Sequence, residues 1–147
     1  MRTVAVAAAT VLAASLLTGC GLLSGATYQR FTVGECIGDP QVSAEGQLQV
    51  GELPIVDCAG AHWAEVYHVE EVTGADFPAD LAVTATAVCE REFEGYVGAH
   101  FSQVSYDPSP MFPTEGSWEI GDRQIVCILV DDGGRSITGS AKGVGAA

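Results

Sequence analysis

The sequence has few basic residues and lacks the short motifs of the common catalytic and metal sites. Lysine and arginine together number 6 against 19 aspartates and glutamates, which gives the 147-residue chain a net charge of −13. Such a shortage of positive charge argues against nucleic acid as a partner. The patterns G-x-S-x-G, S-x-x-K, H-E-x-x-H and C-x-x-C do not occur. We therefore expect no catalytic residues of the familiar serine, zinc or thioredoxin-like kinds.

The segment from Asp57 to His68 is the densest polar cluster, and it is a poor match to a metal site. If it is extended, His62 and His68 share one face but stand about 20 Å apart at 3.3 Å per residue. Glu65 then points to the other face. We expect neither a metal nor a cofactor here. Instead, His62 is predicted to form a hydrogen bond within the turn after Cys58, with Glu65 as a candidate partner.

No apolar run is long enough to span a bilayer as part of the mature protein, but a shorter one opens the chain. Arg2 precedes an apolar stretch from Val4 to Leu16, and the run Leu17-Thr18-Gly19-Cys20 follows. This is the pattern of a bacterial lipoprotein signal, cut before a cysteine that receives lipid. The alternative is an ordinary secretory signal cut near the same place. We expect residues 1–19 to be removed and Cys20 to hold the protein at the extracytoplasmic face of the cell membrane.

The remaining chain suits a single domain. Residues 20–27 are predicted to form a lipidated tether, residues 28–143 the folded domain, and residues 144–147 a frayed tail rich in small side chains. Of the charged residues only Arg2 falls in the signal, so five basic and 19 acidic residues give the mature part a net charge of −14. This surface favours solubility and repels an anionic lipid headgroup layer.

Cysteine usage agrees with a location outside the cytoplasm. Once Cys20 is assigned to the lipid, four of the five cysteines remain, and four can form two disulfides. Three pairings exist. We favour Cys36–Cys58 with Cys89–Cys127 because each joins neighbours along the chain.

The hydrophobic pattern predicts an α+β fold, with a small antiparallel sheet, one main helix packed on it, and two disulfides. Between Pro78 and Tyr96 the apolar residues recur at helical spacing, with Asp80 a plausible cap and Gly95 or Gly98 a plausible end. Five extended segments are predicted: Tyr28–Val33, Leu48–Val56, Ala64–Val72, Trp118–Ile120 and Ile125–Val130. Pro54 restricts the second to an edge of the sheet, the fourth is short, and the apolar run of the fifth suggests a central strand. The segment from Ser105 to Thr114 holds three prolines and is predicted to be a loop.

Two further features are candidates for structural or binding roles. Arg123 follows Asp122 in a tight turn, where we expect it to brace a hairpin through a carboxylate pair, and Trp118 is a further candidate for a structural or binding role. The loop Tyr106–Pro113 presents aromatic and methionine side chains on a stiffened backbone. It either contacts a partner or covers the core.

The order of these features resembles the actinobacterial septum formation domain. The resemblance runs from about Tyr28 to Gly143 and rests on an ordered set of short motifs: Phe31-Thr32-Val33-Gly34-Glu35-Cys36, Val56-Asp57-Cys58, His62, Glu65-Val66, Cys89, Phe93, Tyr96, Pro113-Thr114, Ser117-Trp118, Gly121-Asp122-Arg123, Cys127, Thr138-Gly139-Ser140 and Lys142-Gly143. Glu35 stands where the family usually has aspartate, and Ala61 where proline is common. The resemblance implies an extracytoplasmic α+β domain and supplies no catalytic residues.

These observations favour a lipid-anchored, non-catalytic module that binds an envelope protein or a cell-wall component. One alternative is an envelope hydrolase, which would need His62, Glu65 and Arg123 to converge in a concave site. Another is a cation buffer, suggested by the acidic composition.

Overall fold

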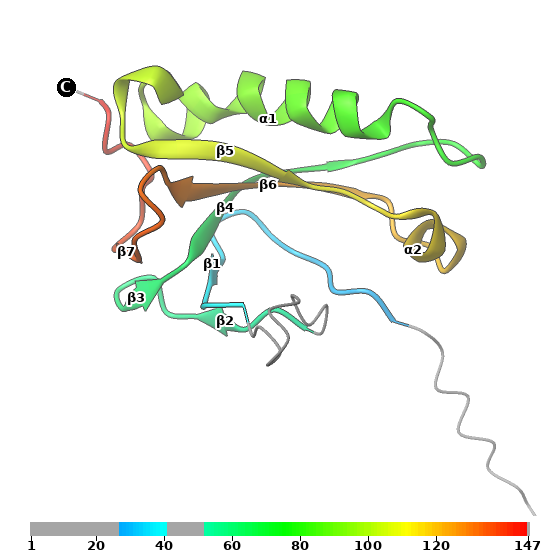
Figure 1. The fold of residues 1–147 in the computed structure, drawn as a ribbon, viewed down its shortest axis with the longest axis horizontal. Helices are drawn as coiled ribbons and strands as arrows, with labels where there is room; N and C mark the ends of the chain where they lie inside the picture. Colours follow the sequence, from blue (N-terminus) through cyan, green and yellow to red (C-terminus); the bar gives the residue numbers. More distant parts are fainter. Residues whose placement is uncertain (1–26, 41–51, 147) are drawn as a thin grey trace, which may run out of the picture.

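The structure is a computed structural model that describes residues 27–40 and 52–146. Helix α1 lies across one face of an antiparallel sheet, so the predicted α+β class is confirmed (Figure 1). The signal, Cys20 and most of the tether lie outside the described residues. The elements in chain order are β1 (Cys36–Ile37), β2 (Ile55–Val56), β3 (Ala61–His62), β4 (Ala64–Glu71), α1 (Leu81–Val97), the 3-10 helix η1 (Phe101–Gln103), β5 (Tyr106–Met111), α2 (Glu115–Glu119), β6 (Gln124–Asp131) and β7 (Ile137–Thr138).

The sheet has five strands in the order β2-β1-β4-β6-β5, and its long central pair is β4 with β6. Ala64 pairs with Val130 at one end and Glu71 with Gln124 at the other, with a register shift between Val66 and His68. The predicted strands at Ala64–Val72 and Ile125–Val130 are therefore confirmed. A strand covered on both faces needs apolar residues in succession, which is the pattern from Ile125 to Val130.

Helix α1 agrees closely with the helical spacing in the sequence. Asp80 occupies the N-cap position, though its side chain makes no capping hydrogen bond, and Gly98 ends the helix with φ 88° and an N–H bond to the Glu94 carbonyl. Glycine reaches this left-handed conformation without steric cost. The helix packs its apolar face against Ile125, Cys127 and Leu129 of β6. This face consists of Leu81, Ala85, Val88, Cys89, Phe93 and Val97.

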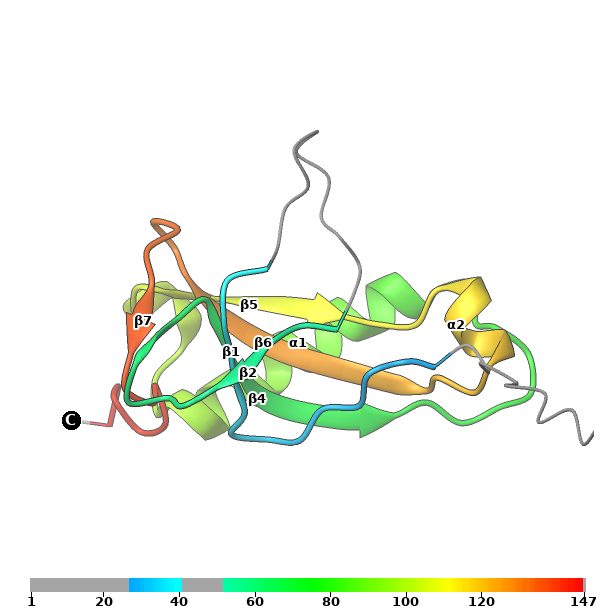
Figure 2. The same ribbon diagram turned by 90° about the horizontal axis from the view of Figure 1, so that it is seen from below.

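The segment predicted as a first strand at Tyr28–Val33 is not a strand. It runs along the sheet face opposite α1, below β6 in Figure 1 and in front of the sheet in Figure 2. Side chains anchor it: Phe31 N–H donates to Gln124 Oε1 over 3.0 Å, and Leu53 N–H to Gln29 Oε1 over 2.7 Å. Phe31 is the buried residue of this segment, and it packs against Ile37, Ala64 and Val66 on that face of the sheet.

The segment predicted as a loop between Ser105 and Thr114 contains strand β5. Pro108 and Pro110 pair with Leu129 and Cys127, on the outermost strand of the sheet. The two prolines are two residues apart, so their nitrogens face the same edge, and on an outer strand that edge can be the one without a neighbour. Proline therefore does not prevent strand formation here.

The short strand predicted from Trp118 to Ile120 is instead part of helix α2 and the turn after it. Thr114 Oγ1 accepts a hydrogen bond from Ser117 N–H, and Ser117 Oγ accepts one from Thr114 N–H, which together form a capping box. Trp118 is buried on this turn of helix. Gly121, with φ 99°, then leads directly into β6, so the predicted hairpin turn is a helix-to-strand turn.

Both predicted disulfides are present, Cys36–Cys58 and Cys89–Cys127, with Cα atoms 5.3 Å and 5.2 Å apart.

In the predicted extended segment Leu48–Val56, residues 48–51 lie outside the described residues, and Ile55–Val56 form the edge strand β2.

The chain is held to the fold beyond the expected start of the tail at residue 144. Gly145 N–H donates to the Val97 carbonyl over 2.9 Å, next to the end of α1. Among the described residues, no helix is both long and apolar enough to cross a membrane.

Candidate functional site

His62 and Glu65 come together at one end of the sheet, near the C-terminal end of α1. Strand β3 pairs His62 with Ile137 of β7, while β4 pairs Glu65 with Cys36 of β1. The side chains of His62 and Glu65 are both buried, with 1% and 0% of their surface exposed. Two residues expected on opposite faces thus meet, because the chain changes sheets between β3 and β4.

The buried carboxylate of Glu65 accepts three hydrogen bonds from neutral donors. Its Oε1 accepts from the Tyr96 hydroxyl over 2.6 Å and from the Ser140 hydroxyl over 2.5 Å, and its Oε2 accepts from Ala141 N–H over 2.7 Å. These donors belong to α1 and to the segment after β7. Glu65 therefore joins three parts of the chain that are distant in sequence, which satisfies a polar group that would otherwise be costly to bury.

The same contacts affect Tyr96. Burial, followed by the hydrogen bond to Glu65, raises the pKa of Tyr96 to about 12. The hydroxyl therefore keeps its proton, and its role as a donor to Glu65, well into the alkaline range.

His62 makes the local turn contact that its sequence position predicts. Its Nδ1 lies 2.9 Å from the Gly60 carbonyl oxygen. Because a carbonyl can only accept, Nδ1 carries the proton and Nε2 of the neutral ring carries a lone pair. That Nε2 is buried and has no hydrogen-bond partner among the described residues.

Cys36 completes this cluster. Its Sγ, a ring nitrogen of His62 and a carboxylate oxygen of Glu65 all lie within 4.8 Å of one another. These residue types include metal ligands, but Cys36 is joined to Cys58, and a disulfide sulfur has no thiolate to offer a metal. In the oxidised protein the cluster keeps two ligands, which is too few for a structural zinc site. The sequence did not indicate that Cys36 would meet His62.

Trp118 and Arg123 form a separate pair at the other end of the sheet. The guanidinium carbon of Arg123 lies 3.6 Å from the centroid of the Trp118 ring. Arg123 also donates to the carbonyls of Trp118 and Asp122, both over 2.7 Å. Arg123 thus braces the turn as expected, but through an aromatic face and backbone carbonyls rather than through a carboxylate.

The two pairs are too far apart to share one site. Glu65 pairs with Leu129, and Arg123 lies six residues before Leu129. Six residues of strand correspond to about 20 Å. The convergence of His62, Glu65 and Arg123 that a hydrolase would need is not formed.

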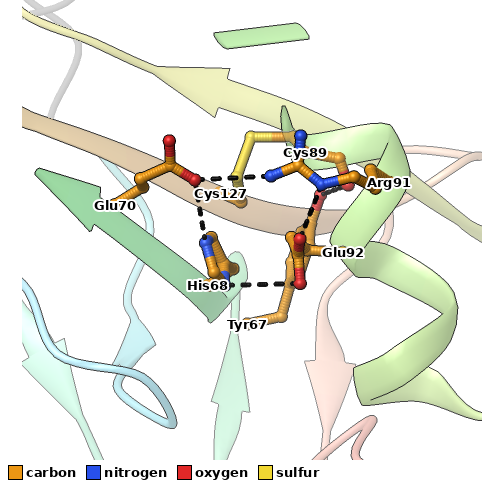
Figure 3. A network of polar contacts seen from close by, with 7 residues as sticks. All are labelled: Tyr67, His68, Glu70, Cys89, Arg91, Glu92 and Cys127. Carbon is orange, nitrogen blue, oxygen red and sulfur yellow. Dashed lines mark hydrogen bonds and ion pairs between the residues drawn. A yellow bond between two sulfur atoms is a disulfide. The ribbon is translucent and has the colours of Figure 1, made fainter. Parts of the chain in front are cut away.

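A third polar group lies on the surface where β4 meets α1 (Figure 3). His68 has Glu70 on one side, with Nε2 3.7 Å from Oε2, and Glu92 on the other, with Nδ1 3.9 Å from Oε2. Arg91 bridges the same two carboxylates. Arg91 first, and His68 after it, lower the pKa of Glu92. These exposed ion pairs contribute little stability. The buried hydrogen bond from the Tyr67 hydroxyl to the Cys89 carbonyl joins β4 to α1 beside them.

An apolar groove of about 1040 Å³ lies on the sheet face opposite α1. Met111 and Phe112, from the segment that the sequence marked as a partner-contact candidate, line it, and Phe112 is 39% exposed. The other side chains that bound it include Phe31, Leu53, Trp63, Ile120, Glu52 and Asp122. No single motif predicts this groove, because its walls come from segments far apart in the chain.

Comparison with known proteins finds relatives in mycobacteria. Two curated relatives, from Mycobacterium tuberculosis and Mycobacterium bovis, carry the name lipoprotein LppN, and each is 29% identical over 121 residues. The alignment covers 79% of this chain and 65% of the relatives' own length, so the chain spans less than two thirds of them. No solved structure matches the chain.

The sequence profile described as Septum formation matches residues 33–145. The matched region begins just before β1 and ends after the segment that donates to Glu65, so it contains both disulfides and the cluster around His62. The chain therefore belongs to the septum formation family.

Proposed function

We propose that this protein is a lipid-anchored, extracytoplasmic module of the cell envelope that binds a protein partner and catalyses no reaction. The lipid anchor is supported by the Leu17-Thr18-Gly19-Cys20 motif and by the name of the mycobacterial relatives. Seven residues, 21–27, separate Cys20 from the domain and span at most about 25 Å when extended. The domain therefore works close to the membrane surface.

The apolar groove opposite α1 is the observation that carries the binding role. Aromatic and methionine side chains are enriched at the cores of protein interfaces, where they bury a large apolar area. Three such side chains line this groove: Trp63, Met111 and Phe112. An exposed apolar area of this kind on a soluble domain marks an interaction site.

The charges around the groove define the partner. Glu52 and Asp122 lie among its lining residues, and the mature chain is strongly acidic. The occupant that fits is a segment of an envelope protein that carries apolar side chains next to lysine or arginine. Opposite charges speed the encounter and set its specificity.

The geometry of the polar residues supports a role without catalysis. Glu65 is fully hydrogen-bonded and buried, and Arg123 lies at the far end of the sheet. The hydrolase alternative required these side chains to meet in one open site, and they do not.

Site-specific photocrosslinking in living cells tests the proposal. A photoreactive amino acid replaces Phe112 in the full-length protein, and the matched control replaces Val83, which is 74% exposed on α1 at the opposite face. We expect one discrete crosslinked protein from position 112, none from position 83, and loss of the product when Met111→Asp is added. Purified partner segments should then bind the wild-type protein and bind Met111→Asp at least tenfold more weakly. Equal crosslinking from both faces would refute a role for the groove.

A further inference from the structure

The two disulfides differ in how far solvent can reach their sulfurs. Cys89 and Cys127 are 1% and 0% exposed and lie inside the core between α1 and β6. Cys36 is fully buried too, but Cys58 is half-buried and sits between the exposed residues Asp57 and Ala59. A thiolate attacks a disulfide at an accessible sulfur. Of the four cysteines, Cys58 is therefore the one with part of its surface open to solvent.

The buried sulfur of this disulfide has a base beside it. A ring nitrogen of His62 lies within 4.8 Å of Cys36 Sγ. Nδ1 is already engaged with the Gly60 carbonyl, so Nε2 is the nitrogen that remains free. In the oxidised protein the sulfur carries no proton, and the buried Nε2 lone pair has no donor among the described residues. An unmatched buried acceptor is a cost to the folded protein.

Reduction removes this cost. When Cys36 is released as a thiol, its S–H becomes a hydrogen-bond donor beside the His62 ring, one nitrogen of which lies within 4.8 Å of Cys36 Sγ. That S–H can bond to the Nε2 that the oxidised form leaves without a donor. His62 therefore favours the reduced state of this disulfide over the oxidised one. His68, which pairs with Cys127 across the sheet, also has a buried Nε2 without a hydrogen bond among the described residues, but the carboxylates of Glu70 and Glu92 lie within 4 Å of its ring.

We propose that Cys36–Cys58 is a redox-active disulfide that exchanges with dithiols, and that His62 is the proton acceptor for Cys36. A thiolate formed from the dithiol attacks Cys58 Sγ, and the bond from Cys58 to Cys36 breaks. The electron pair leaves with Cys36, and the proton lost by the attacking thiol ends on the Cys36–His62 pair. The second thiol of the reagent then displaces Cys58 as a thiol. The dithiol is oxidised to a disulfide, and the protein disulfide is reduced to two thiols.

The surroundings of Cys58 also select the reductant. Asp57 precedes it, and the whole mature surface is acidic, so anionic thiols are repelled. The fitting co-reactant is an uncharged or basic dithiol, including a cysteine pair of another protein. This activity is independent of the groove, which lies on the opposite face of the sheet.

Equilibrium reduction of the full-length protein tests the proposal without any mutation. The membrane-extracted protein is incubated with graded ratios of reduced and oxidised dithiothreitol in the presence of a chelator, which keeps metals away from the free thiols. Thiols are then alkylated and mapped by mass spectrometry. We expect Cys36 and Cys58 to be labelled together while Cys89–Cys127 remains intact. Simultaneous reduction of both disulfides, or reduction of Cys89–Cys127 first, would overturn the proposal.

A variant of His62 tests its role. His62→Asn keeps an amide donor for the Gly60 carbonyl and removes the second ring nitrogen, and His68→Asn is the matched control. We expect the equilibrium constant for reduction of Cys36–Cys58 to fall roughly fivefold in His62→Asn, the effect of one hydrogen bond, and to stay unchanged in His68→Asn. An unchanged constant in a folded His62→Asn protein would refute the role of His62.

Nitrogen NMR of the wild-type protein gives a second measurement, which holds even if His62→Asn does not fold. The resonance of His62 Nε2 should move on reduction, because its lone pair gains a proton donor. The resonances of His68 and His100 should not move. A His62 Nε2 resonance that is the same in the oxidised and reduced proteins would contradict the proposal.

Discussion

The hydroxyl of Tyr96, in the last turn of α1, donates a 2.6 Å hydrogen bond to Glu65 Oε1 on β4, which lies 31 positions earlier in the chain. Ser140 donates to the same oxygen from the other side, 75 positions after Glu65. One buried carboxylate thus links the helix, the centre of the sheet and the C-terminal segment. The contacts of Tyr96 and Ser140 should be coupled, because both act on one oxygen.

Replacing Tyr96 by phenylalanine should destabilise the fold by about 1 to 2 kcal/mol, because it removes a donor from a buried carboxylate. Urea unfolding of the oxidised protein measures this loss. Tyr28→Phe is the control, since among the described residues the Tyr28 hydroxyl has only a 3.4 Å contact with exposed Arg30. Combining Tyr96→Phe with Ser140→Ala should give a non-additive loss. A loss in Tyr96→Phe no larger than in Tyr28→Phe would show that the Glu65 contact is not stabilising.

The stability of the domain should fall as the pH rises above 10. The pKa of Tyr96 is raised to about 12 in the folded protein, against about 10 in the unfolded chain. Burial raises the pKa of Tyr67 as well. Between these values the unfolded chain has lost protons that the folded protein keeps, so the stabilisation is complete below pH 10 and is lost toward pH 12. Urea unfolding between pH 8 and pH 11 measures the slope, which should shrink in Tyr96→Phe and not in Tyr28→Phe.

The contact between Arg123 and Trp118 should depend on the flat shape of the guanidinium and not only on its charge. Arg123→Lys keeps the charge but loses the stacking over the ring and one of the two carbonyl contacts, so we expect a loss of about 1 kcal/mol. Thermal unfolding gives the comparison. The control is Arg135→Lys, at a side chain that is 70% exposed and pairs with Asp131, where the loss should be smaller. Equal losses in both variants would indicate a purely electrostatic role for Arg123.

Cys20→Ser should release the protein from the membrane. The serine hydroxyl cannot form the thioether that carries the lipid, so we expect the variant in the soluble or secreted fraction. Intact-mass analysis of the wild-type protein should show a chain that begins at Cys20 with added lipid. Cys58→Ser, which leaves the signal unchanged, is the control and should stay in the membrane fraction. A wild-type mass without lipid would indicate the ordinary secretory signal instead.

The parts of the fold that the sequence predicted are those in which one local pattern governs the outcome. The helical spacing of Leu81, Ala85 and Val88 and the apolar run at Ile125–Val130 appear in the structure almost as expected. The disulfide pairing followed from closeness along the chain. Tertiary context decided the outcome for Pro108, which is compatible with a strand because of its outer position. Trp118 is helical for a local reason that the prediction overlooked, because Thr114 and Ser117 form a capping box around one turn.

The candidate sites were harder to predict, because their members lie far apart in the sequence. Glu65 was singled out, but nothing in its surroundings indicated that Ser140 and Tyr96 would supply its hydrogen bonds. His62 was expected in a local turn, which it forms, whereas its closeness to Cys36 depends on the pairing of β1 with β4. Long-range pairing of this kind leaves no periodic trace in the sequence.

The two prolines of β5 have a consequence for the crowding that the proposed membrane anchor would cause. An exposed strand edge with free N–H groups is a template on which another copy can add its own strand, and tethering raises the local concentration at which this happens. Pro108 and Pro110 remove two donors from the outer strand. Strand addition between neighbouring copies along this edge is therefore disfavoured, and the domains remain separate instead of joining into a continuous sheet.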